Sequence, residues 1–261
     1  MKYKFFFLVF FLTTLLSSQS FAQKDSLFDD DDKQWYHNYS RIKIGGAGGF
    51  TPYYLFLNTK DLNSFLALGN AGKLTENGLV MYGGEGYGYI MFLKNVRVGG
   101  LGASGKMSSS SLDIANNIKR EVNLDVSFSG FTMGYAIPLA KRFDAAIDVM
   151  LGGGEMNLAI SRSKNSFWQW DSIWNHYGNP AYNESEYTQR MKGDFFSYRV
   201  SLNLEYGILD WLGIRFGAGY VAMVSPQWKL DEKFELNNVP SSISGKGVTL
   251  NLGVFAGAFG N

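Results

Sequence analysis

Apolar and polar side chains alternate with a period of two over long stretches of this chain. In YRVSLNLEYG, residues 198–207, nearly every second side chain is apolar, and the polar positions between them include Arg199 and Glu205. The alternation resumes after Asp210. A period of two indicates β-strands that have one apolar and one polar face.

This periodicity predicts eight strands with no long amphipathic helix between them. They span about 39–50, 80–92, 96–107, 120–138, 142–162, 193–208, 211–224 and 247–259. Short connections at 93–95, 140–142 and 209–210 alternate with long ones at 51–79, 108–119, 163–192 and 225–246. In an up-and-down sheet this order places every short turn at one end, which is typical of outer-membrane barrels with short periplasmic turns and long extracellular loops.

The first residues, MKYKFFFLVFFLTTLLSSQSFAQ, have the composition of an export signal. Lys2 and Lys4 precede an apolar run at 5–16 and a small-x-small site at Ser20–Ala22. We expect a cleavable signal peptide over 1–22 for Sec-dependent export, with an uncleaved anchor as the alternative, although the run is short for a membrane helix. Residues 23–38 contain four consecutive aspartates and predict an acidic disordered leader, so that 39–261 would form the barrel.

The signal, the loop asymmetry and hairpins such as EYGILDWLGIRFGAGY resemble the small bacterial outer-membrane barrels of the OmpA/OmpX/OmpW kind over about 40–259. The resemblance implies an all-β, eight-stranded, antiparallel up-and-down transmembrane barrel in the outer membrane. It also implies contact with outer-membrane lipid and lipopolysaccharide, and insertion by the barrel-assembly machinery. One departure is the sequence Phe259-Gly260-Asn261, where such barrels usually end on an aromatic residue.

The apolar face of each strand is expected to meet lipid, and the polar face to line the lumen. A Lys or Arg on the lipid face costs about 2–4 kcal/mol at mid-depth, and an eight-stranded barrel is only wide enough for its own side chains. The charges should therefore pair across a filled lumen, and we assign to this network Arg41, Lys43, Arg97, Glu121, Asp125, Asp144, Asp148, Arg199, Glu205 and Arg215. Because period two alone does not distinguish inside from outside, a soluble barrel or sandwich of opposite polarity is the alternative.

If the apolar faces meet lipid, particular apolar and aromatic residues should contact the bilayer and its two interfaces. The expected lipid-facing set on the fourth strand is Val122, Leu124, Val126 and Phe128. Aromatic residues beside the short turns predict a lower interfacial girdle of Phe92, Phe143, Tyr206 and Trp211. An upper girdle is expected from Phe195, Phe196, Tyr220 and Trp228.

Three local features carry further expectations. Three glycines at 152–154 predict a β-bulge, because they shift the alternation. The segment 61–69 predicts a short helix, with Asp61 as its N-cap and Leu62, Phe65 and Leu66 as its apolar stripe. The loop 163–192 could bind a surface ligand or pack on the barrel mouth through Phe167, Trp168, Trp170, Trp174 and Tyr177.

The composition argues against several classes of partner and site. A net charge of +1 with no basic block argues against a nucleic-acid partner, and the absence of cysteine excludes disulfides and thiolate metal sites. The segment GLGASGKM, residues 100–107, nearly matches a phosphate-binding loop, but Met107 replaces the required hydroxyl and no helix follows.

We therefore expect a non-enzymatic barrel, without metal or cofactor, that has a structural or surface-interaction role. A narrow pore or a passage for hydrophobic solutes is the first alternative. A membrane enzyme at the outer rim is the second, because His176 lies near Asp171, Ser172 and Glu184 in the loop 163–192.

Overall fold

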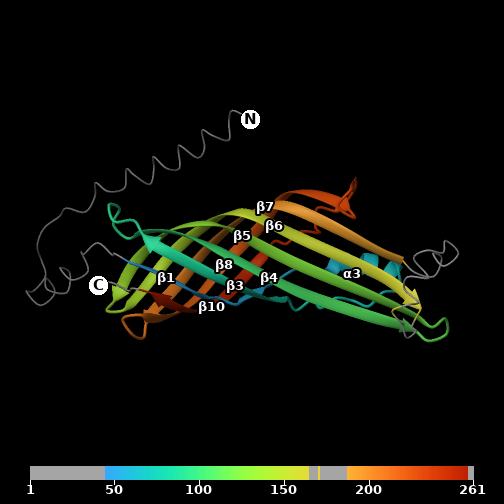
Figure 1. Cartoon of the computed structure of the whole chain (residues 1–261), viewed down its shortest axis with the longest axis horizontal. Helices are drawn as coiled ribbons and strands as arrows, with labels where there is room; N and C mark the ends of the chain where they lie inside the picture. Colours follow the sequence, from blue (N-terminus) through green and yellow to red (C-terminus); the bar gives the residue numbers. More distant parts are fainter. Residues whose placement is uncertain (1–44, 165–169, 171–186, 258–261) are drawn as a thin grey trace, which may run out of the picture. The chain divides into compact units, whose positions relative to one another are not determined.

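The computed structural model describes residues 45–164, 170 and 187–257. Strands dominate these residues and wind obliquely around a barrel (Figure 1). The elements in chain order are β1 (Gly46–Phe50), β2 (Tyr53–Leu55), α3 (Lys60–Leu68), β3 (Leu79–Tyr89), β4 (Val96–Asp113), β5 (Ile118–Ala140), β6 (Phe143–Lys164), β7 (Tyr187–Gly207), β8 (Leu212–Leu230), β9 (Phe234–Glu235) and β10 (Gly247–Gly257). No helix among them is long and apolar enough to span a membrane.

The sheet closes into a ring of eight wall strands. Strands β3 to β8 pair antiparallel in chain order, and β10 pairs with β8. The first wall strand consists of two pieces, β1 and β2, which are separated at Thr51-Pro52 and both lie between β3 and β10. The small strand β9 adds only to the end of β8. The predicted eight-stranded antiparallel barrel is confirmed.

Five adjacent strands are much longer than a bilayer requires. Strands β4 to β8 contain 18, 23, 22, 21 and 19 residues, whereas a tilted spanning strand needs about 9–11. The predicted long loop at 108–119 is wrong, because the β4–β5 ladder continues to the pair Asp113–Ile118 and leaves only 114–117 as the turn. Ladder hydrogen bonds join backbone groups, so the serine run at 108–111 does not interrupt them.

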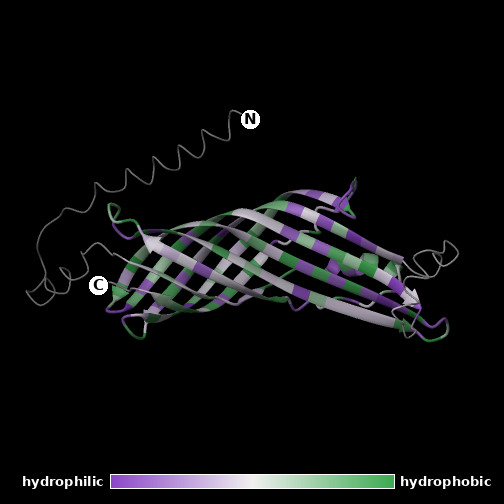
Figure 2. Ribbon diagram, viewed as in Figure 1, coloured by the Kyte–Doolittle hydropathy of each residue, from purple (hydrophilic) through white to green (hydrophobic). Residues whose placement is uncertain are grey.

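Hydrophobic and hydrophilic residues alternate along the wall strands (Figure 2). On β5 the polarity of the two faces reverses midway along the strand. We call the part near the β5–β6 turn the lower half and the part near α3 the upper half. On the exterior of β5, the lower half carries Phe131, Met133, Tyr135, Ile137 and Leu139, and the upper half carries Lys119, Glu121, Asn123, Asp125, Ser127 and Ser129. The lower exterior therefore suits lipid, and the upper exterior suits water.

This reversal corrects the assignment on β5. Val122, Leu124, Val126 and Phe128 were expected to face lipid, yet they point into the barrel and are at most 2% exposed. Above the bilayer the exterior of the barrel is in contact with water. Inward burial of apolar side chains therefore stabilises the fold there, while the strand keeps its period of two. The upper interior is accordingly an apolar core.

The connections of the barrel fill its upper mouth. Leu62 and Leu66 of α3 join the core together with Leu57 and Leu74 from the flanking loop, whereas Phe65 stays half exposed. Asn63 holds this loop, because its side chain accepts a hydrogen bond from the Leu74 N–H at 2.8 Å and donates one to the Leu74 carbonyl at 3.0 Å. The helix prediction is correct, but Thr59 rather than Asp61 occupies the N-cap position.

Two other expectations fail for the same reason. Strand β6 passes through Gly152–Gly154 without a register break, so the predicted bulge is absent, and the apparent change of phase is the reversal of polarity. Phe195 and Trp228 are not part of an upper girdle, because they turn inward and pack edge to face, with ring centroids 5.8 Å apart. Phe196 and Tyr220 do lie on the exterior.

Candidate functional site

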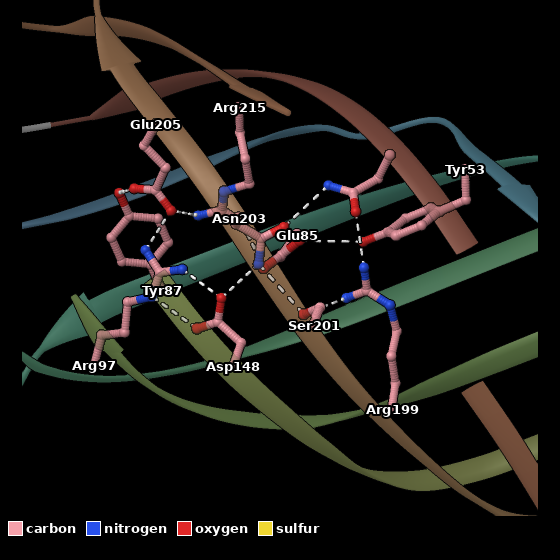
Figure 3. A network of polar contacts seen from close by, with 11 residues as sticks. Tyr53, Glu85, Tyr87, Arg97, Asp148, Arg199, Ser201, Asn203, Glu205 and Arg215 are labelled. Atoms are coloured by element: carbon pink, nitrogen blue, oxygen red, sulfur yellow. Dashed lines mark hydrogen bonds and ion pairs between the residues drawn. The ribbon is translucent and has the colours of Figure 1, made fainter. Parts of the chain in front are cut away.

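The interior of the lower half contains buried charges of both signs. Among the described residues, three cationic and three anionic side chains are less than 9% exposed: Arg97, Arg199, Arg215, Glu85, Asp148 and Glu205. They occupy inward positions on β3, β4, β6, β7 and β8 and converge in the lumen (Figure 3). The group is electrically balanced, and we call it the lumen network.

Arg97 is held by two carboxylates. Its Nε and Nη2 donate to Asp148 Oδ1 and Oδ2 at 2.9 and 2.6 Å, which is the bidentate geometry of a strong ion pair. Its Nη1 donates to Glu205 Oε1 at 2.5 Å. Arg97 therefore connects β4 to both β6 and β7.

Arg215 extends the lumen network from Glu205 to Glu85. Its Nη2 lies 2.8 Å from Glu205 Oε1, and its Nη1 lies 2.5 Å from Glu85 Oε1. These contacts are ion pairs whose N–H groups are not aligned as hydrogen bonds. The guanidinium also lies over the Phe255 ring, 4.1 Å from its centroid, which adds a cation–π contact.

Tyrosines cover the remaining carboxylate oxygens. The hydroxyl of Tyr87 donates to Glu205 Oε2, and that of Tyr53 donates to Glu85 Oε2, each at 3.1 Å. The Tyr87 ring also lies beneath Arg97, 4.4 Å from the Cζ atom to the centroid. Each carboxylate thus has both charged and neutral partners, which offsets the free energy lost when it leaves water.

Arg199 differs because its hydrogen bonds go to neutral groups. It donates to Thr249 Oγ1 at 3.2 Å, Ser201 Oγ at 3.1 Å and Asn251 Oδ1 at 2.8 Å. The amide of Asn251 in turn donates to Asn203 Oδ1, and Asn203 donates to Asp148 Oδ2 at 2.6 Å. These side-chain amides connect Arg199 to the ion pairs and place it at the junction with the apolar core.

Of the charged residues expected in the lumen, some lie there and others lie on the exterior of the barrel. Arg97, Asp148, Arg199, Glu205 and Arg215 meet in the lumen, and Asp144 occupies a half-buried inward position on β6. Glu121 and Asp125 lie on the exterior instead, where they pair with Lys119 and Lys106, because they stand in the upper half of β5. Arg41 and Lys43 lie outside the described residues.

Sequence reasoning missed Glu85 of the lumen network and four neutral side chains that hydrogen-bond to its members, Tyr53, Tyr87, Asn203 and Asn251. Glu85 could have been found from the period of two, because it is two residues from Tyr87 in GGEGYG and both side chains point into the barrel. The two asparagines are polar residues on strands whose other face is apolar, but the expected set contained charged residues only.

The structure describes the residues expected in the lower girdle, but only one of those expected in the aromatic loop. Phe92, Tyr206 and Trp211 are exposed beside the short turns, and Phe143 is half buried there. In the loop, Trp170 is 71% exposed. The remaining expected contact residues of the loop, Phe167, Trp168, Trp174 and Tyr177, lie outside the described residues, as do His176 and the acidic and serine side chains near it.

The lumen network fills the lower lumen and leaves little room there for a substrate. The cavity beside Tyr87, Glu205 and Arg215 measures about 10 Å³, close to the room that a single water needs. In the part of the chain that the structure describes, no group of three His, Asp or Glu side chains could hold a metal ion. The segment 100–107 that resembles a phosphate-binding loop is part of strand β4.

Ring closure, an apolar lower exterior and a polar lumen together define a transmembrane β-barrel. Only helices and closed barrels satisfy all backbone hydrogen bonds within lipid, and barrels of this class lie in the outer membrane. The protein is therefore an outer-membrane barrel, with the turns after β3, β5 and β7 on the periplasmic side and the other connections, among them the short turn 114–117, outside the cell.

Comparison with known proteins gives similarity to solved structures only. No protein-family model and no curated protein sequence matches the chain. A major outer membrane protein from Thermus thermophilus is similar, with 10% identity and a TM-score of 0.43 over 82% of this chain and 98% of that chain. OprG from Pseudomonas aeruginosa has 10% identity and a TM-score of 0.40, over 84% and 97%. Ail of Yersinia pestis has 10% identity and a TM-score of 0.35, over 83% and 99%.

Proposed function

We propose that this protein is a non-conducting, non-enzymatic barrel that has a structural and surface-interaction role in the outer membrane. The filled interior is the observation that carries the proposal. The lumen network blocks the lower half, and the apolar core with α3 fills the upper half. Ions would meet buried ion pairs and then a dry core, so steady conduction is disfavoured.

The upper half supports the surface role. The long strands β4 to β8 carry the polar exterior beyond the length that a bilayer covers. They also carry the connection between β6 and β7, whose aromatic residues, including the exposed Trp170, make it the proposed contact surface for a ligand outside the cell.

Planar-bilayer recording tests the proposal. We expect no steady single-channel steps from the wild type, because buried ion pairs occupy the lower lumen. The variant Arg97→Ala/Glu205→Ala removes one charge of each sign and should raise the conductance above this baseline. The exterior pair Lys106→Ala/Asp125→Ala serves as the matched control and should not conduct.

Heat-modifiable migration on a gel verifies that each variant has inserted and folded. Steady steps from the folded wild type would contradict the proposal and favour a narrow pore instead.

A further inference from the structure

A groove of about 510 Å³ lies on the exterior of the barrel and extends from β3 to β7. Its floor consists of Gly102, Ser129 and Gly153, which are register neighbours on β4, β5 and β6 and face outward. A Cβ atom built on Gly102 or Gly153 would come no closer than 3.5 Å or 3.9 Å, respectively, to atoms beyond its chain neighbours. Barrel packing therefore does not require glycine at these two positions, and the space above them is accessible from outside.

An aromatic ridge lies beside this groove. Tyr82 on β3 forms one wall of the groove and is 63% exposed, and Phe50 on β1 is 57% exposed. Their rings stack, with centroids 6.4 Å apart and an interplanar angle of 13°. Since β1 pairs with β3, and β3 to β6 pair in order, the ridge and the groove occupy adjacent parts of one wall (Figure 1). Exposed aromatic rings offer a large and rigid contact area to a partner surface.

A ridge with a groove beside it is a self-complementary surface. In a dimer with twofold symmetry, the same patch of both copies meets itself. An axis parallel to the barrel that passes close to Ser104 on β4, between the ridge and the floor, would place Tyr82 of each copy over Ser129 and Gly153 of the other. Two convex walls touch only along a narrow line, whereas small residues flanked by large ones allow contact across several strands.

Charges along the upper side of the groove complete this match. On β6 and β7, Glu155 and Asp194 share one cation, because the Lys192 Nζ lies 3.1 Å from Glu155 Oε2 and 3.8 Å from Asp194 Oδ1. This acidic cluster of three side chains retains one negative charge. On β4, the Lys106 side chain is 59% exposed and its Nζ lies 3.9 Å from Asp125 Oδ1, so it can reach a second acidic group outside its own chain.

The tilt of the strands sets Lys106 and Glu155 at the same height. Register pairs followed once around the ring from Tyr89 return to the same strand at Leu79, ten residues nearer the upper end. Register neighbours therefore climb by a little more than one residue per strand, which is the stagger of a closed barrel. Asn157, the register neighbour of Lys106 two strands away on β6, is accordingly higher than Lys106, and Glu155 is level with it. The same twofold axis thus brings Lys106 of each copy to Glu155 of the other.

We propose that this wall is the interface of a twofold dimer of the protein in the outer membrane. The aromatic ridge of each copy fills the groove of the other, and Lys106 of each copy neutralises the acidic cluster of the other. The interface goes beyond the proposed function, because it lies on the exterior and leaves the lumen of each barrel closed.

Cysteine cross-linking tests this inference, since the chain contains no cysteine of its own. In the full chain in lipid vesicles, Ser104→Cys puts a thiol from each copy beside the axis, and mild oxidation should give a covalent dimer. Ala218→Cys is the matched control, because Ala218 faces outward on β8, on the opposite side of the ring, and should stay monomeric. No covalent dimer from Ser104→Cys, or equal amounts from both variants, would overturn the inference.

Two changes of shape probe the ridge and the groove in the Ser104→Cys background. Gly102→Leu/Gly153→Leu fills the floor, and Tyr82→Ala removes the ring that enters the groove. Each should lower the yield of covalent dimer about tenfold, as expected for the centre of an interface. Heat-modifiable migration verifies that each variant is folded. An unchanged yield from either folded variant contradicts the proposed fit.

Charge reversal tests the ion pair across the axis. Lys106→Glu and Glu155→Lys, each in the Ser104→Cys background, place like charges opposite each other in their own dimers and should lower the yield. When the two variants are mixed in equal amounts, with a tag on one to separate the products by mass, both contacts of a mixed dimer become a Glu–Lys pair. The mixed dimer should therefore predominate over both parental dimers. A mixed dimer in merely statistical proportion would show that these charges do not meet, and the proposed axis would be wrong.

Discussion

Arg97 shows how single residues hold the lower half of the barrel together. Its three hydrogen bonds all end on carboxylates, and its side chain is 2% exposed. Its partners Asp148 and Glu205 are buried as well, so none of the three can exchange its partners for water. Removing one member of such a group leaves opposite charges buried without compensation, which is far less favourable than losing the whole group.

Arg97→Ala should therefore destabilise the barrel by about 3–5 kcal/mol. The measurement is the free energy of unfolding in urea, followed in detergent micelles by tryptophan fluorescence. Lys106→Ala is the control, because Lys106 is largely exposed and 3.9 Å from Asp125, and an exposed pair contributes about 0–1 kcal/mol. Equal losses in the two variants would contradict the buried role of Arg97.

At the scale of single residues, the lumen network could be predicted from the sequence only in part. Period two placed Arg199, Glu205 and Arg215 on the polar face of their strands, and in the structure all three are buried inside the barrel. It did not indicate which charges meet, because Arg97 and Glu205 are 108 residues apart and come together only through ring closure.

At the scale of one element, β5 contains two environments on a single exterior face. Its outward side chains change from Ser129 to Phe131 within one step of the alternation. Neither the register nor the direction of the strand changes there. Since the backbone continues unchanged, we infer that the change of residue type marks the bilayer boundary.

A charge scan along β5 tests where the bilayer ends. Phe131→Lys should cost up to about 2–4 kcal/mol, the range for a lysine on the lipid face. Asn123→Lys, on the same face of the upper half, should stay within about 0.5 kcal/mol, as at other surface positions. Urea unfolding in lipid vesicles measures both. A similar loss at Asn123 would show that the upper half also lies in lipid.

At the scale of the whole molecule, the barrel combines two kinds of stabilisation. The lower half has a polar interior and an exterior that lipid covers, and the upper half has an apolar core that its own loops cover. The lower half thus depends on hydrogen bonds and ion pairs inside, and the upper half on hydrophobic burial.

Two leucines on opposite faces distinguish these contributions. Leu124 is fully buried in the upper core, and its replacement by Ala should cost about 2–5 kcal/mol. Leu202 is 54% exposed on the lower exterior, so Leu202→Ala should lower the free energy of unfolding by less than about 1 kcal/mol in the same micelles. Equal losses would mean that the upper half lacks the packed core described above.

The sequence by itself determined the strands, their antiparallel order, the short periplasmic turns and the faces of the lower half, because period two and turn length are local properties. Only the tertiary structure showed that the change of phase in the sequence is a reversal of polarity rather than a β-bulge, and so placed Val122 and Leu124 inward and Glu121 and Asp125 outward. The physical reason is that an alternating strand reads the same in lipid and in water. Only its length relative to the bilayer, and the core that its neighbours build, determine which face is buried.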